Sequence, residues 1–206
     1  MVIGRLAAVS SYLLQLYERA GDADARAYSL FALDGIRHLL GAHKAWWGVM
    51  SVSERGPQLL GSFRSGLPAE YETAWESVKH DDSVTTMIAK VKNRTVILDS
   101  DTIPPTSDLV RLAEGFDLRQ TLSLSVDLPD QDAFMFVSLY RGHGQRPFTP
   151  EDRSVNQSLI PHLHAAWKQN LRGRLRTVED QTQGDVHKAF IDQAGSVVQA
   201  EEGFAA

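Results

Sequence analysis

The chain has 206 residues, 43% of them hydrophobic and 23% charged, which is enough for one globular domain with a sizeable core. Its net charge of −5 argues against a protein that binds nucleic acid or an anionic membrane directly, because both require a basic surface. The sequence has no cysteine, no signal peptide and no apolar run that could span a membrane, so we expect a cytoplasmic protein without disulfides or membrane contact.

Two helices are predicted in the first 41 residues. Within residues 1–20, two apolar strips recur at helical spacing: Val2, Leu6, Val9, Leu13, Leu16 and Ala20, and beside them Ile3, Ala7, Leu14 and Tyr17. Two strips indicate a helix that packs on its own domain with one and on a second molecule with the other. A single wide core-facing stripe would look the same. A second helix is predicted over residues 24–40, with Gly41 as its stop signal.

The middle of the chain alternates between strand and helix patterns. We predict a hairpin from 45–53 and 58–66, short helices at 67–79 and 83–93, a strand at 95–98, a helix at 107–116 after the cap Ser107, and a second hairpin from 120–128 and 133–141. The fold class is therefore α+β, with a mostly antiparallel five-stranded sheet flanked by helices and long terminal helices. No glycine-rich strand–turn–helix unit indicates a dinucleotide fold.

The second hairpin predicts a sheet with two different faces. One face carries aliphatic residues, and the other carries Ser123, Ser125 and Ser138 together with Phe134, Phe136 and Tyr140. The hydroxyl-bearing face could be solvated, as in many antiparallel sheets. If the helices of residues 67–93 cover it instead, they enclose hydroxyl groups and aromatic rings together, which is typical of a small-molecule pocket.

Catalytic and metal-binding patterns are weak. No serine lies in a nucleophile elbow, and His162 and His164 are two residues apart on a predicted helix and so face different directions. His80, Asp81 and Asp82 could ligate a metal or act in acid–base chemistry, but three consecutive residues more often form a solvated loop or a helix cap. We therefore expect no enzyme, no metal and no cofactor. A small hydrolase stays as a third hypothesis.

Four stretches together resemble the N-terminal sensing domain of LuxR-type transcriptional regulators. They are "GLPAEYETAWESVKHDDSV", "GFDLRQTLSLSV", "FVSLYR" and "RPFTPEDRSVNQSLIPHLHAAW". The resemblance spans residues 1–176 and implies a fold similar to GAF and PAS domains. It implies a sensor that binds an unknown small molecule and dimerises, with a ligand-free dimerisation module as the alternative.

The resemblance also implies a set of ligand-binding residues. In the autoinducer-binding members, aromatic residues on the helix after the first hairpin and an aspartate beyond it hold the ligand. By position these are Tyr71, Trp75 and Asp81 here, and Ser83 and Ser138 match hydroxyl positions. Trp47 is expected to contribute from the first strand, or Trp46 if that residue faces inward. The family's tryptophan is Tyr71 here and its Asp-Pro is Asp81-Asp82, so the ligand stays unknown.

The last predicted helix starts at a strong signal. Thr149 is expected to cap it, with Pro150 in the first turn, and Pro161 is expected to bend it. Such a helix could connect a sensor to an output domain or simply pack at the end of the domain.

Residues 177–206 read as a polar linker followed by an incomplete second unit. A hairpin is predicted around 190–191 and 197–198, and we expect this part to be mobile. The chain is expected to be a homodimer and to reach DNA only through an output domain that it lacks.

Overall fold

The computed structural model describes residues 2–21, 24–53, 56–103, 107–128, 133–179, 189–191 and 197–200. The helices are α1 (Val2–Arg19), α2 (Ala25–Leu39), α3 (Glu70–Val78), α4 (Ser83–Lys90), α5 (Asp108–Gly115) and α6 (Pro150–Glu179), with short 3-10 turns η1 (Lys79–Asp81) and η2 (Ser100–Thr102). The strands are β1 (Lys44–Ser53), β2 (Gly56–Ser65), β3 (Val96–Asp99), β4 (Gln120–Leu128), β5 (Ala133–Arg141), β6 (Ala189–Ile191) and β7 (Val197–Ala200).

The main sheet has five strands in the order β2-β1-β5-β4-β3. Each neighbouring pair is antiparallel, and β5 lies at the centre between β1 and β4. The two predicted hairpins form β1–β2 and β4–β5, and the lone predicted strand is the edge strand β3. The α+β class and the five-stranded antiparallel sheet predicted from the sequence are confirmed.

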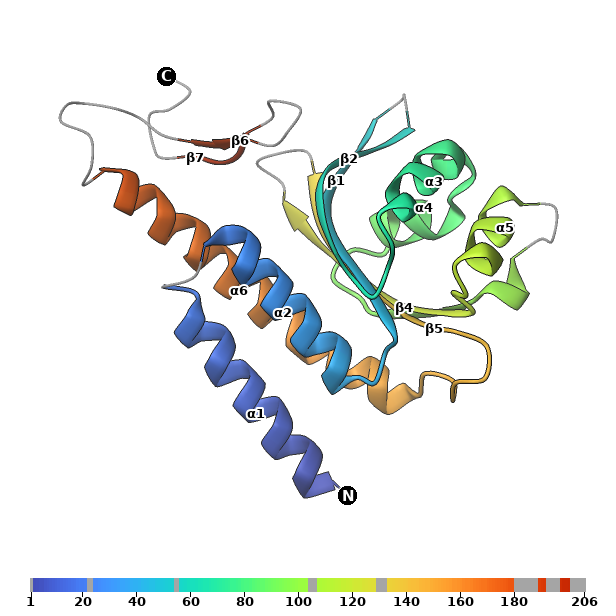
Figure 1. Cartoon of the computed structure of the whole chain (residues 1–206), viewed down its shortest axis with the longest axis horizontal. Helices are drawn as coiled ribbons and strands as arrows, with labels where there is room; N and C mark the ends of the chain where they lie inside the picture. Colours follow the sequence, from blue (N-terminus) through green and yellow to red (C-terminus); the bar gives the residue numbers. More distant parts are fainter. Residues whose placement is uncertain are drawn as a thin grey trace.

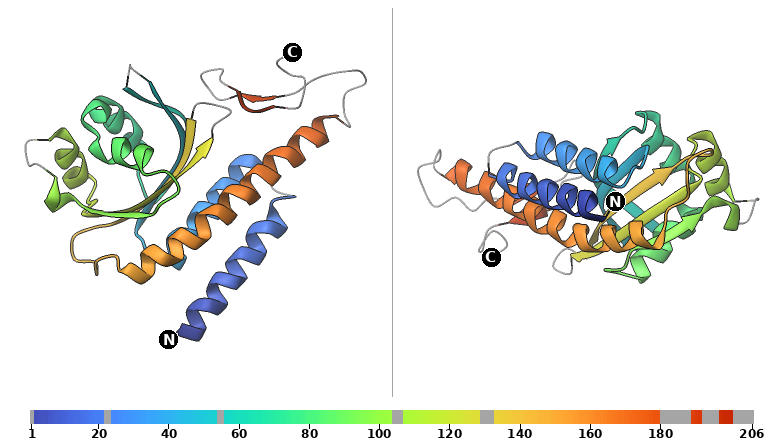
Figure 2. Two further views of the ribbon diagram at one scale, coloured as in Figure 1. Left: turned by 180° about the vertical axis from the view of Figure 1, so that it is seen from behind. Right: turned by 90° about the horizontal axis from the view of Figure 1, so that it is seen from below.

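Helices cover both faces of the sheet (Figures 1 and 2). The aliphatic face of β4 and β5 packs against α2 and α6 in one hydrophobic core, which includes Leu122, Val137 and Leu139. The opposite face packs against α3, α4 and α5 in a second core, which includes Phe134, Phe136 and Tyr140. The face that carries hydroxyl groups is therefore covered: Ser123 and Ser125 are at most 1% exposed. Of the two arrangements considered from the sequence, the structure shows the one in which α3–α5 cover the hydroxyl-bearing face.

The first helix forms a third layer outside α2 and α6 (Figure 2). Its inward side is tied to α2 by two hydroxyl groups: Tyr12 donates to the carbonyl of Ala32 at 2.7 Å, and Tyr28 donates to the carbonyl of Leu16 at 3.1 Å. Gly35 lets the helices approach this closely, because a Cβ there would lie 2.5 Å from the Tyr12 ring.

The outward side of α1 carries large apolar residues. Leu6 and Leu14 are each 65% exposed, whereas Leu16 and Ala20 are buried. Tyr17 is 37% exposed and lies against α6, where its hydroxyl is 3.0 Å from a ring nitrogen of His162. Helix α1 therefore has two apolar sides, as predicted. Leu6, which the sequence placed in one strip with Leu16, lies on the exposed side.

The start of α6 holds three parts of the chain together. Thr149 caps the helix by accepting from the Asp152 amide at 3.2 Å, and its own amide donates to the Asp152 carboxylate at 3.0 Å. The same carboxylate, which is fully buried, accepts from Arg5 of α1 at 2.7 Å and from Arg141 of β5 at 3.2 Å. Arg141 also donates to the carbonyls of Leu40 and Gly41 at the end of α2. We call Arg5, Arg141 and Asp152 the Asp152 cluster.

The cluster determines the charge state of its carboxylate. Burial by itself would raise the pKa of Asp152. The hydrogen bonds from Arg5 and from the Thr149 amide, together with the charge of Arg141, outweigh burial and hold the pKa below its ordinary value of 3.8. Asp152 therefore stays ionised over the physiological pH range. The predicted cap is confirmed, while the buried ion pair behind it was not predicted.

The remaining predictions for the C-terminal part have mixed outcomes. Pro161 lies within α6, and the helix continues past it. Strands β6 and β7 pair antiparallel, as the predicted hairpin requires. Residues 180–188, 192–196 and 201–206 lie outside the described part of the chain. The mobility predicted for the tail falls mostly on these residues. Within the described residues, no helix has both the length and the apolar character needed to cross a membrane.

Candidate functional site

A small cavity lies between the hydroxyl-bearing face of the sheet and helices α3–α5. Its volume is about 50 Å³. The strands contribute Trp46, Thr121, Phe136, Ser138 and Tyr140 to its lining. The helices contribute Tyr71, Trp75, Ile88, Leu109 and Leu112. The side chains from the sheet arrive there because every second residue of a strand points to the same face.

Aromatic rings occupy much of the space around the cavity. The Trp46 ring lies edge-on to Tyr71, Trp75 and Phe136, with centroid distances of 5.2, 5.2 and 4.8 Å. An apolar cavity that accepts a benzene ring measures roughly 150 Å³. The present volume of about 50 Å³ is therefore about a third of what one such ring requires.

Hydroxyl groups form a polar strip along the strands. Ser138 and Ser123 lie opposite each other on β5 and β4, and their hydroxyls are 2.8 Å apart. The Tyr71 and Tyr140 hydroxyls are 3.3 Å apart. Burial raises the pKa of both tyrosines well above the ordinary value, so both remain neutral phenols at physiological pH.

Asp82 is the charged residue of the cavity lining, and its carboxylate is already occupied. One oxygen accepts from the Thr85 amide at 2.8 Å, and the other accepts from the Thr85 hydroxyl and from the Trp75 indole, both at 2.7 Å. Asp82 is thus the cap of α4 and fixes the orientation of the Trp75 ring. It is only 5% exposed.

One polar group of the lining has no partner. The indole nitrogen of Trp46 is buried, and no hydrogen-bond acceptor reaches it among the described residues. Buried donors are nearly always paired, either within the protein or with an ordered molecule. This nitrogen is therefore a donor that can still accept a partner, such as an ordered water or a ligand.

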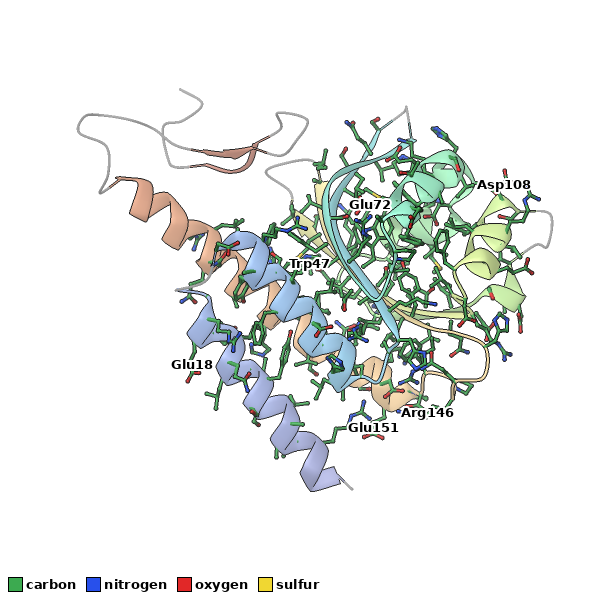
Figure 3. All side chains as sticks on the ribbon, in the orientation of Figure 1. Glu18, Trp47, Glu72, Asp108, Arg146 and Glu151 are labelled. Carbon is green, nitrogen blue, oxygen red and sulfur yellow. The ribbon has the colours of Figure 1, made fainter. Side chains whose placement is uncertain are left out.

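The structure brings together three of the six expected ligand-binding residues: Tyr71, Trp75 and Ser138. Trp47 does not join them, because it lies on the face of the sheet that packs against α2 and α6 (Figure 3). There its ring contacts Phe63 and Trp167, at centroid distances of 5.8 and 5.9 Å. Adjacent strand residues point to opposite faces, so Trp46 takes the place in the cavity.

Asp81 and Ser83 also lie outside the cavity. Both are exposed. The Asp81 carboxylate accepts from the Ser107 hydroxyl at 2.5 Å and from the Asp108 amide at 2.8 Å, so it connects η1 to the start of α5. Asp82, the capping residue between them, turns inward instead. An aspartate that directly precedes a helix signals a cap, and this signal could have identified Asp82 from the sequence.

Two further points complete the site. Tyr140 and Thr121 were not among the expected ligand-binding residues, although Tyr140 lies two residues after Ser138 and so shares its face. No group of three acidic or histidine side chains that could hold a metal ion occurs in the described part of the chain, which includes His80, Asp81 and Asp82.

Comparison with known proteins identifies the fold. No protein-family model matches the sequence, and no curated protein does. Among solved structures, the chain is similar to an N-acylhomoserine lactone dependent LuxR family transcription factor, CepR2 from Burkholderia cenocepacia, with a TM-score of 0.65 and 17% identity over 82% of this chain and 98% of that one. It is similar to SdiA from Escherichia coli, with a TM-score of 0.58 and 12% identity over 89% and 74% of the two chains.

A third similar structure has another function. It is the phycoerythrobilin-bound GAF domain of a cyanobacterial phytochrome, with a TM-score of 0.54 and 13% identity over 82% of this chain and 97% of that one. These likenesses show that the chain has the fold shared by LuxR-family ligand-binding domains and GAF domains. The fold implied by the resemblance in the sequence is confirmed.

Proposed function

We propose that this chain is the sensory domain of a LuxR-type transcriptional regulator and that it binds an unidentified small molecule between the sheet and helices α3–α5. The observation that carries the proposal is the cavity lined by hydroxyl groups and by Trp46, whose buried indole nitrogen has no partner among the described residues. The fold supports it, since CepR2 is described as dependent on an acylhomoserine lactone and SdiA has been crystallised with octanoyl-rac-glycerol. These are ligands of CepR2 and SdiA. The proposal does not name the ligand of this chain.

The competing function is a dimerisation module that binds no ligand. The small volume of about 50 Å³ favours it. The buried indole donor argues against it, because a buried donor without a partner costs about 1–3 kcal/mol, and a ligand with an acceptor oxygen would remove that cost. Enzymatic activity is not part of the proposal, since the similar structures are regulators and photoreceptor domains.

A thermal-shift screen against a metabolite library tests ligand binding. A ligand at a hundredfold excess over its Kd stabilises a protein by about 2.7 kcal/mol, which raises the melting temperature of a domain of this size by about 5–10 °C. Ala113→Val narrows the cavity and should remove the shift, because Ala113 lines it. Ala8→Val, on the exposed side of α1, is the matched control and should keep the shift. A library without a hit that depends on Ala113 contradicts the proposal.

We further propose that two copies associate through the outward side of α1, which carries Leu6 and Leu14. Large apolar side chains gathered on one helix side commonly mark an interface. As part of a transcriptional regulator, the dimer would act in the cytoplasm. DNA would be contacted by a separate output domain and not by these residues, whose net charge is −5.

A further inference from the structure

The unpaired nitrogen of Trp46 has a defined place on the sheet. Trp46 pairs in register with Ser138 on β5, and Ser138 pairs with Ser123 on β4. An indole donor and two hydroxyl groups therefore lie in one row across three strands. Trp46 is only 3% exposed, so bulk water does not satisfy its nitrogen. Its acceptor is then an ordered water or a ligand held in the cavity.

The cavity has one polar side and one apolar side. The strands contribute Trp46 and the hydroxyl-bearing residues Thr121, Ser138 and Tyr140 to the lining. The opposite side is formed by aliphatic residues of α4 and α5, such as Ile88, Leu109 and Leu112. A matching ligand has an oxygen atom on one edge and a hydrocarbon surface on the other.

The charges around the cavity exclude an anionic ligand. No lysine, arginine or histidine lines it among the described residues, and its charged group is the Asp82 carboxylate. A second negative charge there would be buried without a counter-ion, beside a like charge. A cation is disfavoured as well, because three donors already occupy Asp82.

The size of the cavity depends on Trp46. Its ring touches Tyr71, Trp75 and Phe136 and so fills the space between the sheet and α3. A molecule with more than a few heavy atoms does not fit in about 50 Å³ while this ring keeps its position.

We propose that the cavity selects a small, uncharged molecule whose acceptor oxygen binds the Trp46 indole N–H, and that the Trp46 ring excludes larger ligands. The inference rests on the proposed sensory function and specifies its ligand class. It makes Trp46 the residue that determines specificity, in both polarity and size.

Indole N–H signals in nuclear magnetic resonance spectra give a direct test. The chain has four tryptophans, and the signal lost in Trp46→Phe identifies Trp46. Three planar probes of the same shape are titrated: acetone, acetate and acetamidinium. Acetone is expected to move the Trp46 signal downfield, with saturation, while acetate and acetamidinium leave it unchanged. Trp47→Phe removes a tryptophan from the other face of the sheet and is the matched control, in which acetone binding should persist.

The size limit is tested with cyclohexanone. The wild-type protein should bind it at least tenfold more weakly than Trp46→Ala does, because the alanine leaves room for the ring. The signals of Trp75 report binding in both proteins, since Trp75 also lines the cavity. If Trp46→Ala does not fold, Trp46→Leu serves the same comparison.

The outcomes separate this inference from the proposed function. Acetate or acetamidinium binding better than acetone overturns the inference, and so does equal binding of cyclohexanone by wild type and variant. So does a library ligand that shifts Trp75 but leaves Trp46 unmoved, although the sensory function then stands. If no probe and no library compound reaches the cavity of wild type or variant, the proposed function fails together with the inference.

Discussion

Asp152 shows how much of this structure depends on one carboxylate. It accepts hydrogen bonds from Arg5 of the first helix and from Arg141 of the central strand. It also accepts from the amide of Thr149, the residue that caps the last helix. None of these partners lies near Arg5 in the sequence. Arg141 in turn is held by the carbonyls at the end of α2, so the cluster joins four elements.

Replacing Asp152 by asparagine should lower the free energy of unfolding by about 3–5 kcal/mol, because the change leaves the buried Arg141 without its counter-charge and Arg5 with Glu151 alone. Denaturant unfolding at pH 7 measures the loss. Glu151→Gln, which removes an exposed charge next to it, is the matched control and should cost less than ~1 kcal/mol. Equal losses in the two variants would contradict a structural role for the cluster.

The stabilisation that Asp152 provides should depend on pH. The pKa of Asp152 is lower in the folded than in the unfolded protein, so its contribution is complete above the unfolded value of 3.8 and is lost as the pH falls through the folded value. The difference in stability between wild type and Asp152→Asn should therefore be constant from pH 7 to about pH 5 and shrink below pH 3.8. A difference that does not depend on pH over this range would show that Asp152 acts without its charge.

Asp82 makes a second residue-scale prediction. Asp82→Ala should lower the free energy of unfolding by about 1–3 kcal/mol, since it removes the cap of α4 and leaves the Trp75 nitrogen unpaired. Asp82→Asn keeps an acceptor oxygen for the cap and should cost less. Thermal unfolding of the two variants gives the comparison, and a neutral Asp82→Ala would refute the double role.

At the scale of elements, the outward side of α1 carries the dimer prediction. Leu6→Glu combined with Leu14→Glu should raise the dimer Kd at least ~10-fold, because association would bury unpaired carboxylates. Sedimentation velocity measures the shift. Ser11→Glu with Gln15→Glu adds the same charge to exposed polar positions of α1 and should leave the Kd nearly unchanged. A wild-type protein that stays monomeric at high micromolar concentration would refute the proposed interface.

The elements were easier to predict than the site. The alternation of residue types in β4 and β5 predicted the two faces of the sheet correctly, because alternate residues of these strands lie in two different cores. The pair Trp46-Trp47 resisted the same reasoning, since both faces of β1 are buried and a tryptophan suits either. Asp81-Asp82 was assigned wrongly although the predicted helix began at residue 83, because the position implied by the resemblance was followed in place of the cap signal at Asp82. The Asp152 cluster depends on contacts across more than a hundred residues, which no local pattern contains.

At the scale of the whole molecule, the two cores on opposite sides of one sheet serve different purposes. The core with α2 and α6 is built from closely packed aliphatic and aromatic residues. The core with α3–α5 contains the cavity and its polar strip. Under the proposed function, changes in the second core would alter ligand binding while the first core keeps the terminal helices in place.

Net charge gives a prediction for the molecule as a whole. With a charge of −5, this chain alone should give no sequence-selective shift of duplex DNA in a gel, even at low salt, because counterion release from the phosphates needs a basic surface. Tight, selective binding would overturn the assignment of DNA contacts to a separate domain. Non-selective retardation that disappears with modest salt would leave that assignment intact.

The position of α1 as a third layer has a consequence for how the protein opens. Helix α1 packs on α2 and α6 (Figure 1), so its detachment exposes the outer part of the first core, including Leu16 and Ala20, while α2 and α6 still cover the sheet. Its amide protons should therefore exchange with solvent deuterium through a partial opening that costs less free energy than global unfolding. The amides of β5, buried along its whole length, should exchange only when the entire domain unfolds. Release of α1 also withdraws Arg5 from Asp152, so that detachment of the outer helix loosens the start of the last one.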